Sequence, residues 1–257
     1  MKLIDAITFN NEFDMLESRL EYLYDVVDTF LIVESNYTHS GNSKPLHLKE
    51  NLDRFSKYAS KMMVRTYGVD ETFDFVDSWK LEVAQRNGIM IFLDEFNNDD
   101  IIMVSDADEI PNKDKLDEIK SVAHKNGAVR FNQLMFYYNL SNRLVSFPIW
   151  GASFAARKDF LRGNPPNLVR MQRRDILGLN DTGWHLTYFM SAEQIKNKIQ
   201  SFAHVEFNTE YYTDLERIQK SIDEGSDIYE REDHEFEKVD PETFFPADFL
   251  ECFSKWA

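Results

Sequence analysis

The chain has 257 residues, of which 43% are hydrophobic and 14% aromatic, and its formal net charge at pH 7 is -16. This composition is typical of a globular protein with a full core and excludes a disordered one. The strong acidity excludes nucleic acid and anionic membranes as general partners, because both need a basic protein surface. An anionic nucleotide would therefore need a local pocket that is basic or contains a metal ion.

The sequence contains neither a disulfide framework nor an apolar segment long enough for a membrane. Its single cysteine, Cys252, excludes an intrachain disulfide and a cysteine-rich zinc site. Asp5 interrupts the region where a signal peptide would begin its apolar core, and no apolar run approaches the roughly 20 residues of a membrane span. We therefore expect no membrane span and a reducing, cytoplasmic location.

The first part of the chain alternates strand-like and helix-like segments. Phe13, Leu16 and Leu20 recur at helical spacing, whereas Phe30 to Val33 is a continuous apolar run. We predict strands at 3–9, 29–34, 62–67 and 101–104, with helices at 12–24, 48–60 and 73–96 between them. Strand, helix and strand within about 30 residues form a βαβ unit, so the pattern predicts a parallel, Rossmann-like half.

The rest of the chain has a different pattern. Residues 128–139 alternate apolar and polar side chains, as a half-buried antiparallel strand does. We also predict helices at 113–125, 192–203 and 215–224, short strands at 144–149, 152–156 and 184–189, loops at Pro165-Pro166 and 175–181, and a solvated charged segment at 227–240. No repeat or linker divides the chain, so we expect one α/β domain with a mixed central sheet.

Two carboxylates directly follow the apolar strand 101–104. Asp106 and Asp108 are two residues apart, and in an extended segment such residues point the same way. Two oxygen ligands at the carboxyl end of a buried strand suit Mg²⁺ or Mn²⁺ with positions left open for a diphosphate. The alternative is that they form a turn or cap the helix expected to begin near Asn112.

Several motifs, in the same order along the chain, resemble glycosyltransferase family 17 over roughly residues 3–235. They are Asn10-Asn11-Glu12, Leu16-Glu17-Ser18-Arg19-Leu20, Val33-Glu34-Ser35-Asn36-Tyr37-Thr38, Lys44-Pro45-Leu46, Gln85-Arg86-Asn87, Ser105-Asp106-Ala107-Asp108-Glu109-Ile110-Pro111, Gly183-Trp184-His185 and Ser201-Phe202-Ala203-His204.

The resemblance implies a GT-A glycosyltransferase fold, a nucleotide-sugar donor and inversion at the anomeric carbon. The animal members use UDP-N-acetylglucosamine and add the bisecting residue to N-glycans. In this chain we expect one catalytic domain over 1–257, with a nucleotide-sugar-binding half at 1–111 and an acceptor-binding half at 112–257. We expect a UDP-sugar donor, a saccharide or glycan acceptor, and none of the membrane anchor and luminal stem of the animal members.

Glycosyl transfer requires that the charge of the leaving diphosphate be neutralised and that the acceptor hydroxyl lose a proton. We assign Asp106 and Asp108 to a Mn²⁺ or Mg²⁺ ion, with Asp106 also near the ribose. In GT-A enzymes a late histidine commonly completes the metal shell, and neutral imidazole suits Mn²⁺. His185 is our candidate for this histidine, and His204 is the alternative.

The general base must be a carboxylate or histidine near the acceptor. Asp181, just before Gly183-Trp184-His185, is the first candidate, with Glu109 and Asp175 as alternatives. Because Asn180 to Gly183 is a turn-forming sequence, an Asx-turn is the competing explanation for Asp181.

Nucleotide contacts are expected where the first two strands end. Asn10 and Glu12 end the first strand, and Glu34 ends the second. Arg86, on the long helix before the acidic motif, could reach a phosphate or the base, and its alternative is an ion pair with Glu82 at i-4.

Other segments could contact the substrates. Trp79, Trp150 and Trp184 could stack on sugar rings, although we expect at least one of them to pack in the core. The polar loop 35–45 follows the second strand and is expected to contact the donor.

Two other functions are compatible with part of this pattern. A sugar nucleotidyltransferase also binds nucleotides and metals, but it usually has an early glycine-rich phosphate loop, and residues 1–20 contain no glycine. A non-catalytic saccharide-binding relative is the third possibility, and the intact acidic motif argues against it.

Overall fold

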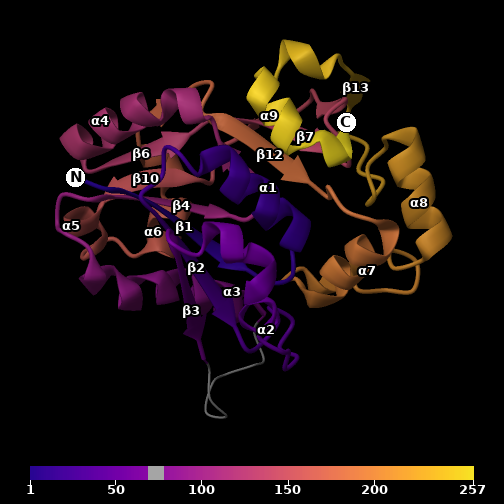
Figure 1. Ribbon diagram of the computed structural model, residues 1–257. Helices are drawn as coiled ribbons and strands as arrows, with labels where there is room; N and C mark the ends of the chain where they lie inside the picture. Colours follow the sequence, from indigo (N-terminus) through magenta and orange to yellow (C-terminus); the bar gives the residue numbers. More distant parts are fainter. Residues whose placement is uncertain (69–77) are drawn as a thin grey trace.

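Strands and helices alternate in the amino-terminal part of the protein (Figure 1). The computed structural model describes residues 1–68 and 78–257. Its first elements are β1 (Leu3–Phe9), α1 (Phe13–Leu23), β2 (Thr29–Ser35), α2 (His47–Glu50), β3 (Met62–Tyr67), α3 (Ser78–Gly88) and β4 (Ile101–Asp106). The four strands predicted for this part and the helix predicted at 12–24 are therefore confirmed.

Shorter strands follow in the second part. They are β5 (Glu109–Pro111), β6 (Ala128–Phe131), β7 (Gln133–Tyr137), β8 (Asn142–Leu144), β9 (Ile149–Trp150), β10 (Phe154–Arg157), β11 (Gly178–Leu179), β12 (Gly183–Thr187) and β13 (Phe236–Lys238). The helices are α4 (Leu116–Asn126), α5 (Lys158–Leu161), α6 (Pro166–Met171), α7 (Ala192–Ser201), α8 (Leu215–Glu224) and α9 (Ala247–Cys252).

The larger sheet has seven strands in the order β11-β6-β10-β4-β1-β2-β3. Neighbours among β3, β2, β1 and β4 run parallel, which is the Rossmann-like half predicted from the alternation of strands and helices. β10 runs antiparallel to both β4 and β6. The predicted α/β class with a mixed central sheet is thus confirmed.

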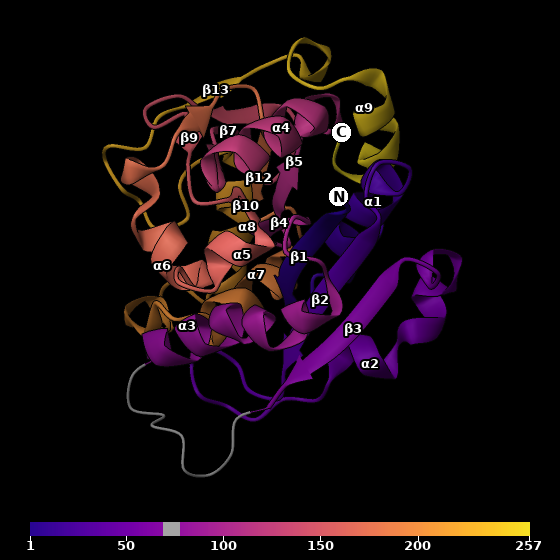
Figure 2. The same ribbon diagram turned by 90° about the vertical axis from the view of Figure 1, so that its left-hand side faces the viewer.

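Helices cover both faces of this sheet, as Figure 2 shows. Leu3 and Ile7 of β1 pack with apolar residues of α1, α4 and α9 on one face. Ile4 and Ala6 pack with residues of α5, α6 and the turn after α3 on the other face. Because both faces are covered, β4 is buried along residues 101–105, as its continuous apolar run predicts.

A second sheet of six strands includes β13, β8, β7, β12 and β5 in this order, with β9 added beside β7. The chain passes from β4 of the first sheet to β5 of the second through Ala107 and Asp108. Ile7 of β1 and Leu186 of β12 belong to one core cluster, so the two sheets are packed together. The acidic motif therefore lies where the two sheets meet.

The prediction of one continuous helix at 48–60 is wrong. The chain makes the short helix α2 and then a 3₁₀-helix, Leu52–Tyr58, with a kink at Phe55 (φ -103°, ψ 15°). The helix predicted at 73–96 also divides, into α3 and a 3₁₀-helix, Ile89–Glu95, and its residues 73–77 lie outside the described residues.

The strand predicted at 128–139 is two strands in different sheets. β6 belongs to the first sheet and β7 to the second, and Asn132 separates them. The Asn132 N–H donates to the Leu179 carbonyl and to the Thr182 hydroxyl, at 3.0 and 2.8 Å. These bonds to distant residues bend the chain where the alternating pattern indicates continuity.

Two segments predicted as irregular contain regular structure. Pro166 is the first residue of α6, a position that suits the fixed φ of proline. Part of 175–181 forms β11, and the predicted solvated segment 227–240 contains β13 and buries Ile228 and Tyr229.

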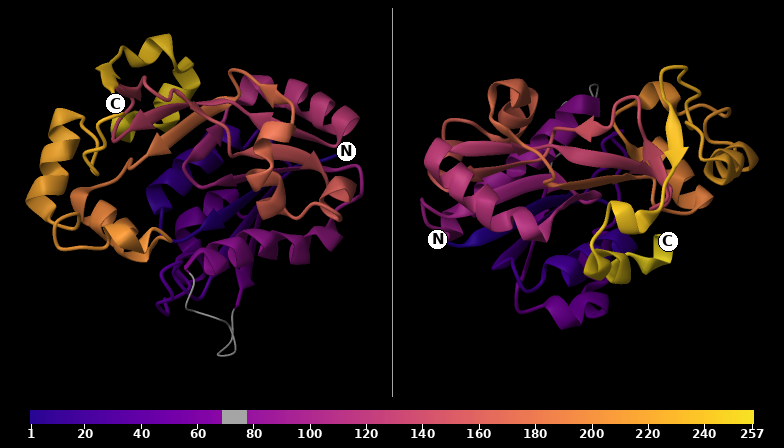
Figure 3. Two further views of the ribbon diagram at one scale, coloured as in Figure 1. Left: turned by 180° about the vertical axis from the view of Figure 1, so that it is seen from behind. Right: turned by 90° about the horizontal axis from the view of Figure 1, so that it is seen from above.

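The predicted helices at 192–203 and 215–224 are confirmed as α7 and α8. Ser191 and Gln194 form a capping box at the start of α7, and Gly225 ends α8 with φ 67°. The two helices pack together at the edge of the molecule away from the amino terminus (Figure 3). Within the described parts of the chain, no helix combines the length and apolar character needed to span a membrane.

Candidate active site

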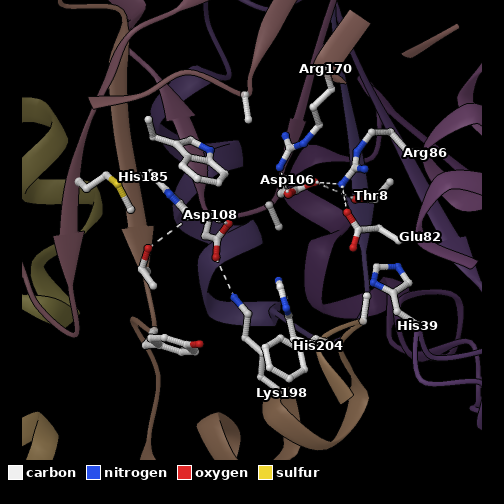
Figure 4. A pocket seen from close by; sticks show the side chains of 18 of the residues that line it. Thr8, His39, Glu82, Arg86, Asp106, Asp108, Arg170, His185, Lys198 and His204 are labelled. Carbon is white, nitrogen blue, oxygen red and sulfur yellow. Dashed lines mark hydrogen bonds and ion pairs between the residues drawn. The ribbon is translucent and has the colours of Figure 1, made fainter. Parts of the chain in front are cut away.

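A cavity of about 1250 Å³ opens at the carboxyl ends of β1 and β4 (Figure 4). Thr8 and Asp106, which are paired across β1 and β4, both line it. Other lining residues come from the loop after β2, from α3 and α6, and from β12 and α7. Open α/β sheets bind ligands at this end of their strands. The cavity thus lies where the acidic motif predicts a site.

Asp106, the last residue of β4, is held between two arginines. Its Oδ1 accepts a hydrogen bond from Nη2 of Arg86 at 3.1 Å, and its Oδ2 accepts one from Nη2 of Arg170 at 2.7 Å. Burial disfavours the charged carboxylate, but the charges of Arg170 and Arg86 outweigh burial and hold the pKa of Asp106 well below its usual range. The side chain is 31% exposed, so an anionic oxygen pair faces the cavity.

Asp108 lies between Lys198 of α7 and His185 of β12. Lys198 Nζ donates to Oδ2 at 2.8 Å, and His185 Nε2 is 3.7 Å from Oδ1. Burial raises the pKa of Asp108, but the charges of Lys198 and His185 outweigh burial and lower it overall. The Asp108 carboxylate also raises the pKa of Lys198, against the effect of burial. Both groups are therefore charged at neutral pH.

Glu109 connects the acidic motif to α6 and β9 from within the core. Its carboxylate accepts hydrogen bonds from the Asp106 N–H, the Ser153 hydroxyl, the Trp150 indole and Arg170. The side chain is fully buried and does not line the cavity. A carboxylate with so many donors stabilises the motif and is not placed to meet an acceptor hydroxyl.

Arg19 of α1 supports the backbone of the acidic motif. It is fully buried and forms an ion pair with Asp5 of β1, with Nη2 to Oδ1 at 2.6 Å. Its Nη1 also donates to the backbone carbonyls of Asp106, Ala107 and Glu109, at 3.0, 3.3 and 3.0 Å. Arg19 thereby satisfies three carbonyl groups of the acidic motif from within the core.

Asp106 and Asp108 do not cap the helix that follows them. Asn112 caps the 3₁₀-turn that leads into α4, since its Oδ1 accepts the Asp114 N–H at 3.1 Å. The carboxylates of Asp106 and Asp108 instead accept hydrogen bonds from other side chains, namely Arg86, Arg170, Thr8 and Lys198.

Asn10, Glu12 and Glu34 were predicted to contact the nucleotide, and two of these three side chains line the cavity. Asn10 and Glu12 do so, and Glu12 Oε2 accepts the N–H of Asn10 at 2.9 Å. Glu34 does not line the cavity. It is fully buried, accepts the Leu48 N–H at 3.0 Å, and pairs with Lys44 at 3.3 Å. Glu34 therefore anchors the segment that follows β2.

Arg86 makes the ion pair considered as its alternative role and also contacts the acidic motif. It pairs with Glu82 on the same helix at 2.9 Å, as the i-4 spacing predicts, and it also reaches Asp106. The neighbouring Gln85 donates to the Val33 carbonyl at 3.2 Å and bonds His39 of the loop after β2 at 2.8 Å. Through these bonds α3 holds the loop at the edge of the cavity.

The remaining candidates lie in different surroundings. Asp181 and Asp175 are exposed and do not line the cavity. Asp181 has φ 58° and its backbone carbonyl accepts from Asn112, which fits the competing explanation of a turn residue. Of the three tryptophans, Trp79 and Trp150 line the cavity, whereas Trp184 is 4% exposed and packs in the core.

The two candidate histidines differ in their distance from the motif. His185 lies beside Asp108, and its Nδ1 is a buried atom without a hydrogen-bond partner among the described residues. His204 is at the edge of the cavity, 46% exposed, with its ring 4.7 Å from that of Trp79 and its Nδ1 bonded to Glu206. The geometry thus favours His185 over His204 as a ligand candidate.

The donor types at this site fit Mn²⁺ or Mg²⁺. Within the described residues, no three His, Cys, Asp or Glu side chains are grouped as a complete metal cage. Such a cage is not needed, because Mg²⁺ is usually held by one or two carboxylates together with substrate phosphates and water. Asp108 and His185 would hold the ion, with Asp106 as a further ligand after Arg86 or Arg170 shifts. A bound ion would neutralise charge on a leaving diphosphate.

Three residues that contact the acidic motif, Arg170, Lys198 and Arg19, were not predicted to do so. Arg170 lies on α6, where no helix was predicted and only Pro165-Pro166 was expected to be a loop, although proline at the first helical position is a signal for a helix there. Lys198 lies on a helix that was predicted, but its partner is 90 residues away in sequence. Arg19 belongs to a motif of the family resemblance, and its polar side chain on the apolar face of α1 was the available signal.

Comparison with known proteins gives a family for the chain. Residues 1–240 match the model of glycosyltransferase family 17. A rat and a human protein, each named beta-1,4-mannosyl-glycoprotein 4-beta-N-acetylglucosaminyltransferase, are both 32% identical to this chain over 120 residues. The match covers 44% of this chain and 22% of each relative, so the chain aligns with about a fifth of their length.

Solved structures resemble the chain at lower identity. S. aureus TarS 1-349 in complex with UDP-GlcNAc is 11% identical with a TM-score of 0.45, and the match covers 88% of this chain and 72% of that one. GalNAc-T7 with UDP, GalNAc and Mn²⁺ is 11% identical with a TM-score of 0.44, over 88% of this chain and 51% of that one. The family match extends over most of the chain, and this chain therefore belongs to glycosyltransferase family 17.

Proposed function

We propose that the protein is a metal-dependent, inverting glycosyltransferase of the GT-A type. It transfers a sugar, with N-acetylglucosamine as the first candidate, from a UDP-linked donor to a saccharide acceptor. The observation that carries the proposal is the pair Asp106 and Asp108 at the end of β4, facing a cavity of about 1250 Å³. Family membership and the names of the animal relatives support the choice of reaction and sugar.

The nucleoside is proposed to lie over the ends of β1 and β2. Asn10, Glu12 and His39 line this part of the cavity, and Gln85 and Arg86 of α3 close it. The diphosphate then falls beside the acidic motif. A metal ion on Asp106 and Asp108 would neutralise its charge, and the neighbouring cations would add to this effect.

The acceptor is proposed to enter from the side of the second sheet. Trp150 and Met135 line the cavity there, together with Thr187 of β12. The indole of Trp150 is held by its bond to Glu109 and by His185, whose ring lies 4.8 Å away. An aromatic side chain fixed in this way suits the C–H face of a sugar ring.

Calorimetric titration with UDP, with and without Mn²⁺, tests the metal and donor parts together. We expect UDP to bind only with a divalent ion, and Asp108→Asn to abolish this binding while the melting temperature shows a folded protein. Asp117→Asn, on an exposed position of α4 outside the cavity, is the matched control and should bind as the wild type does. Equal metal-linked affinity in Asp108→Asn would contradict the proposed metal site.

Product analysis distinguishes the proposed glycosyltransferase from a sugar nucleotidyltransferase and from a non-catalytic relative. A glycosyltransferase releases UDP from UDP-N-acetylglucosamine when an acceptor is present. A sugar nucleotidyltransferase would instead release pyrophosphate from UTP and a sugar phosphate. A non-catalytic relative would bind UDP-sugar with no turnover in either assay.

A further inference from the structure

The cavity is rich in cations although the chain as a whole carries a net charge of -16. Four of the lining cations are in ion pairs: Arg86, Arg170, Lys198 and Arg231. Three more line the cavity and form no ion pair with any residue that the structure describes: Arg130, Arg173 and Arg174. In a chain with 45 Asp and Glu, three cavity-lining arginines without a carboxylate partner among the described residues need an explanation.

Arg130 lies in a space that two glycines leave open. A Cβ atom on Gly178 would lie 2.5 Å from Nη2 of Arg130, and one on Gly151 would lie 3.3 Å from its Cδ. The Nε of Arg130 is buried and has no hydrogen-bond partner among the described residues. Burying such a donor without an acceptor is unfavourable. The guanidinium is therefore accommodated by the local backbone while part of its hydrogen-bonding capacity is unused.

The other two arginines follow α6 directly. Arg173 donates to the Arg170 carbonyl at 3.2 Å, which places it on the turn next to the residue that holds Asp106. Arg174 is exposed and lines the same cavity. Together with Arg130 on β6 they line one cavity, and we call these three residues the arginine cluster.

The sheet places Arg130 away from the proposed nucleoside position. Arg130 is in register with Phe154 of β10, and Phe154 with Val104 of β4, two residues before Asp106. β6 is thus two strands from β4, about 10 Å away. β1 and β2, where the nucleoside is proposed to lie, are on the opposite side of β4. A ligand group that contacts Arg130 is therefore beyond the diphosphate, on the acceptor side.

We propose that the arginine cluster binds an anionic substituent of the acceptor saccharide, either a carboxylate or a phosphate. This inference rests on the proposed function, because the donor defines which side of the cavity is left for the acceptor. Arginine suits both anions, since its planar fork donates two parallel hydrogen bonds to a carboxylate or a phosphate. The acidic surface would repel such an acceptor, and the arginine cluster offsets that repulsion at one position.

Paired probes test this inference. Glucuronic acid is compared with glucose, and mannose 6-phosphate with mannose, by ligand-observed NMR titration of the protein with and without saturating UDP and Mn²⁺. We expect at least one anionic sugar to bind about tenfold more tightly than its neutral counterpart. Which pair differs identifies the carboxylate or the phosphate as the preferred group.

Two variants assign the preference to the cluster. The double variant Arg130→Gln, Arg174→Gln should lose the preference and keep the UDP affinity of the wild type. Arg162→Gln makes the same kind of substitution once, at an exposed position outside the cavity, and should keep the preference.

Three results would overturn the inference. They are equal binding of charged and neutral sugars, a preference that survives in the double variant, and a loss of UDP affinity in the double variant as large as the loss for the anionic sugar. The last result would assign the arginines to the donor. Failure of the wild type to bind UDP with any divalent ion would instead refute the proposed function, and the titrations without UDP still decide the anion preference.

Discussion

Replacing Arg19 by methionine tests whether the buried ion pair supports the acidic motif. Arg19 and Asp5 are both fully buried. Arg19→Met leaves the Asp5 carboxylate buried without its partner and removes the donor that bonds the carbonyls of Asp106 and Glu109. Removing one partner of a buried pair costs about 3–5 kcal/mol, which is a large part of a typical total of about 5–15 kcal/mol.

Urea denaturation gives the free energy of unfolding for comparison with a surface control. Arg54 also pairs with two carboxylates, those of Asp14 and Glu17, but its side chain is 38% exposed. Arg54→Met should cost only about 0–1 kcal/mol. If Arg19→Met costs no more than Arg54→Met, the argument for the buried pair is wrong.

The double variant Asp5→Leu, Arg19→Met separates stability from organisation of the motif. It removes both charges, so it should be more stable than Arg19→Met alone. The carbonyls of the motif still lack the hydrogen bonds that Arg19 Nη1 donates. We therefore expect metal-linked UDP binding, measured by calorimetry, to stay weakened. Wild-type UDP affinity in this double variant would show that Arg19 does not position the motif.

Three further predictions concern the cavity. The pKa of Asp108 is lowered in the folded protein, so its carboxylate contributes fully to folding stability above the unfolded pKa of about 3.9. That contribution is lost as the pH falls through the lower folded pKa. Lys198→Met should move the loss to higher pH, as NMR titration of the Asp108 carboxyl group can measure. Asp181→Asn should keep near-normal turnover in steady-state kinetics, whereas replacing a general base would lower the rate of transfer by about 10²- to 10⁴-fold. Residues 36–44 should exchange amide hydrogens more slowly with UDP-sugar bound, because His39 lines the cavity, and unchanged exchange would contradict a donor contact.

Local patterns in the sequence were sufficient for the Rossmann-like half and for the position of the acidic motif. The apolar runs of β2 and β4 predict buried strands, since such runs are stable only when both faces are covered. The spacing of Asp106 and Asp108 predicts two carboxylates at the end of β4. The capping box at Ser191 likewise marks the start of α7 by bonds between near neighbours.

The predictions failed where distant segments decide the local structure. Residues 128–139 have the alternation of one strand, but the Asn132 N–H bonds to Leu179 and Thr182, which divides the segment between two sheets. The turn at Asp181 is stabilised in the same way, by a bond between its carbonyl and Asn112. No pattern within a short window contains these partners.

The charges around the two aspartates were decided only by the tertiary structure. Arg170 is 64 residues from Asp106, and Lys198 is 90 residues from Asp108. Helical periodicity tells which face of α7 is apolar, but the packing of α7 against the second sheet determines which cation meets which carboxylate. The sequence by itself therefore determined that two carboxylates stand at the end of a buried strand. Only the packing of α6 and α7 onto the sheets determined which cations surround them, because ion pairs depend on distance in space and not on separation along the chain.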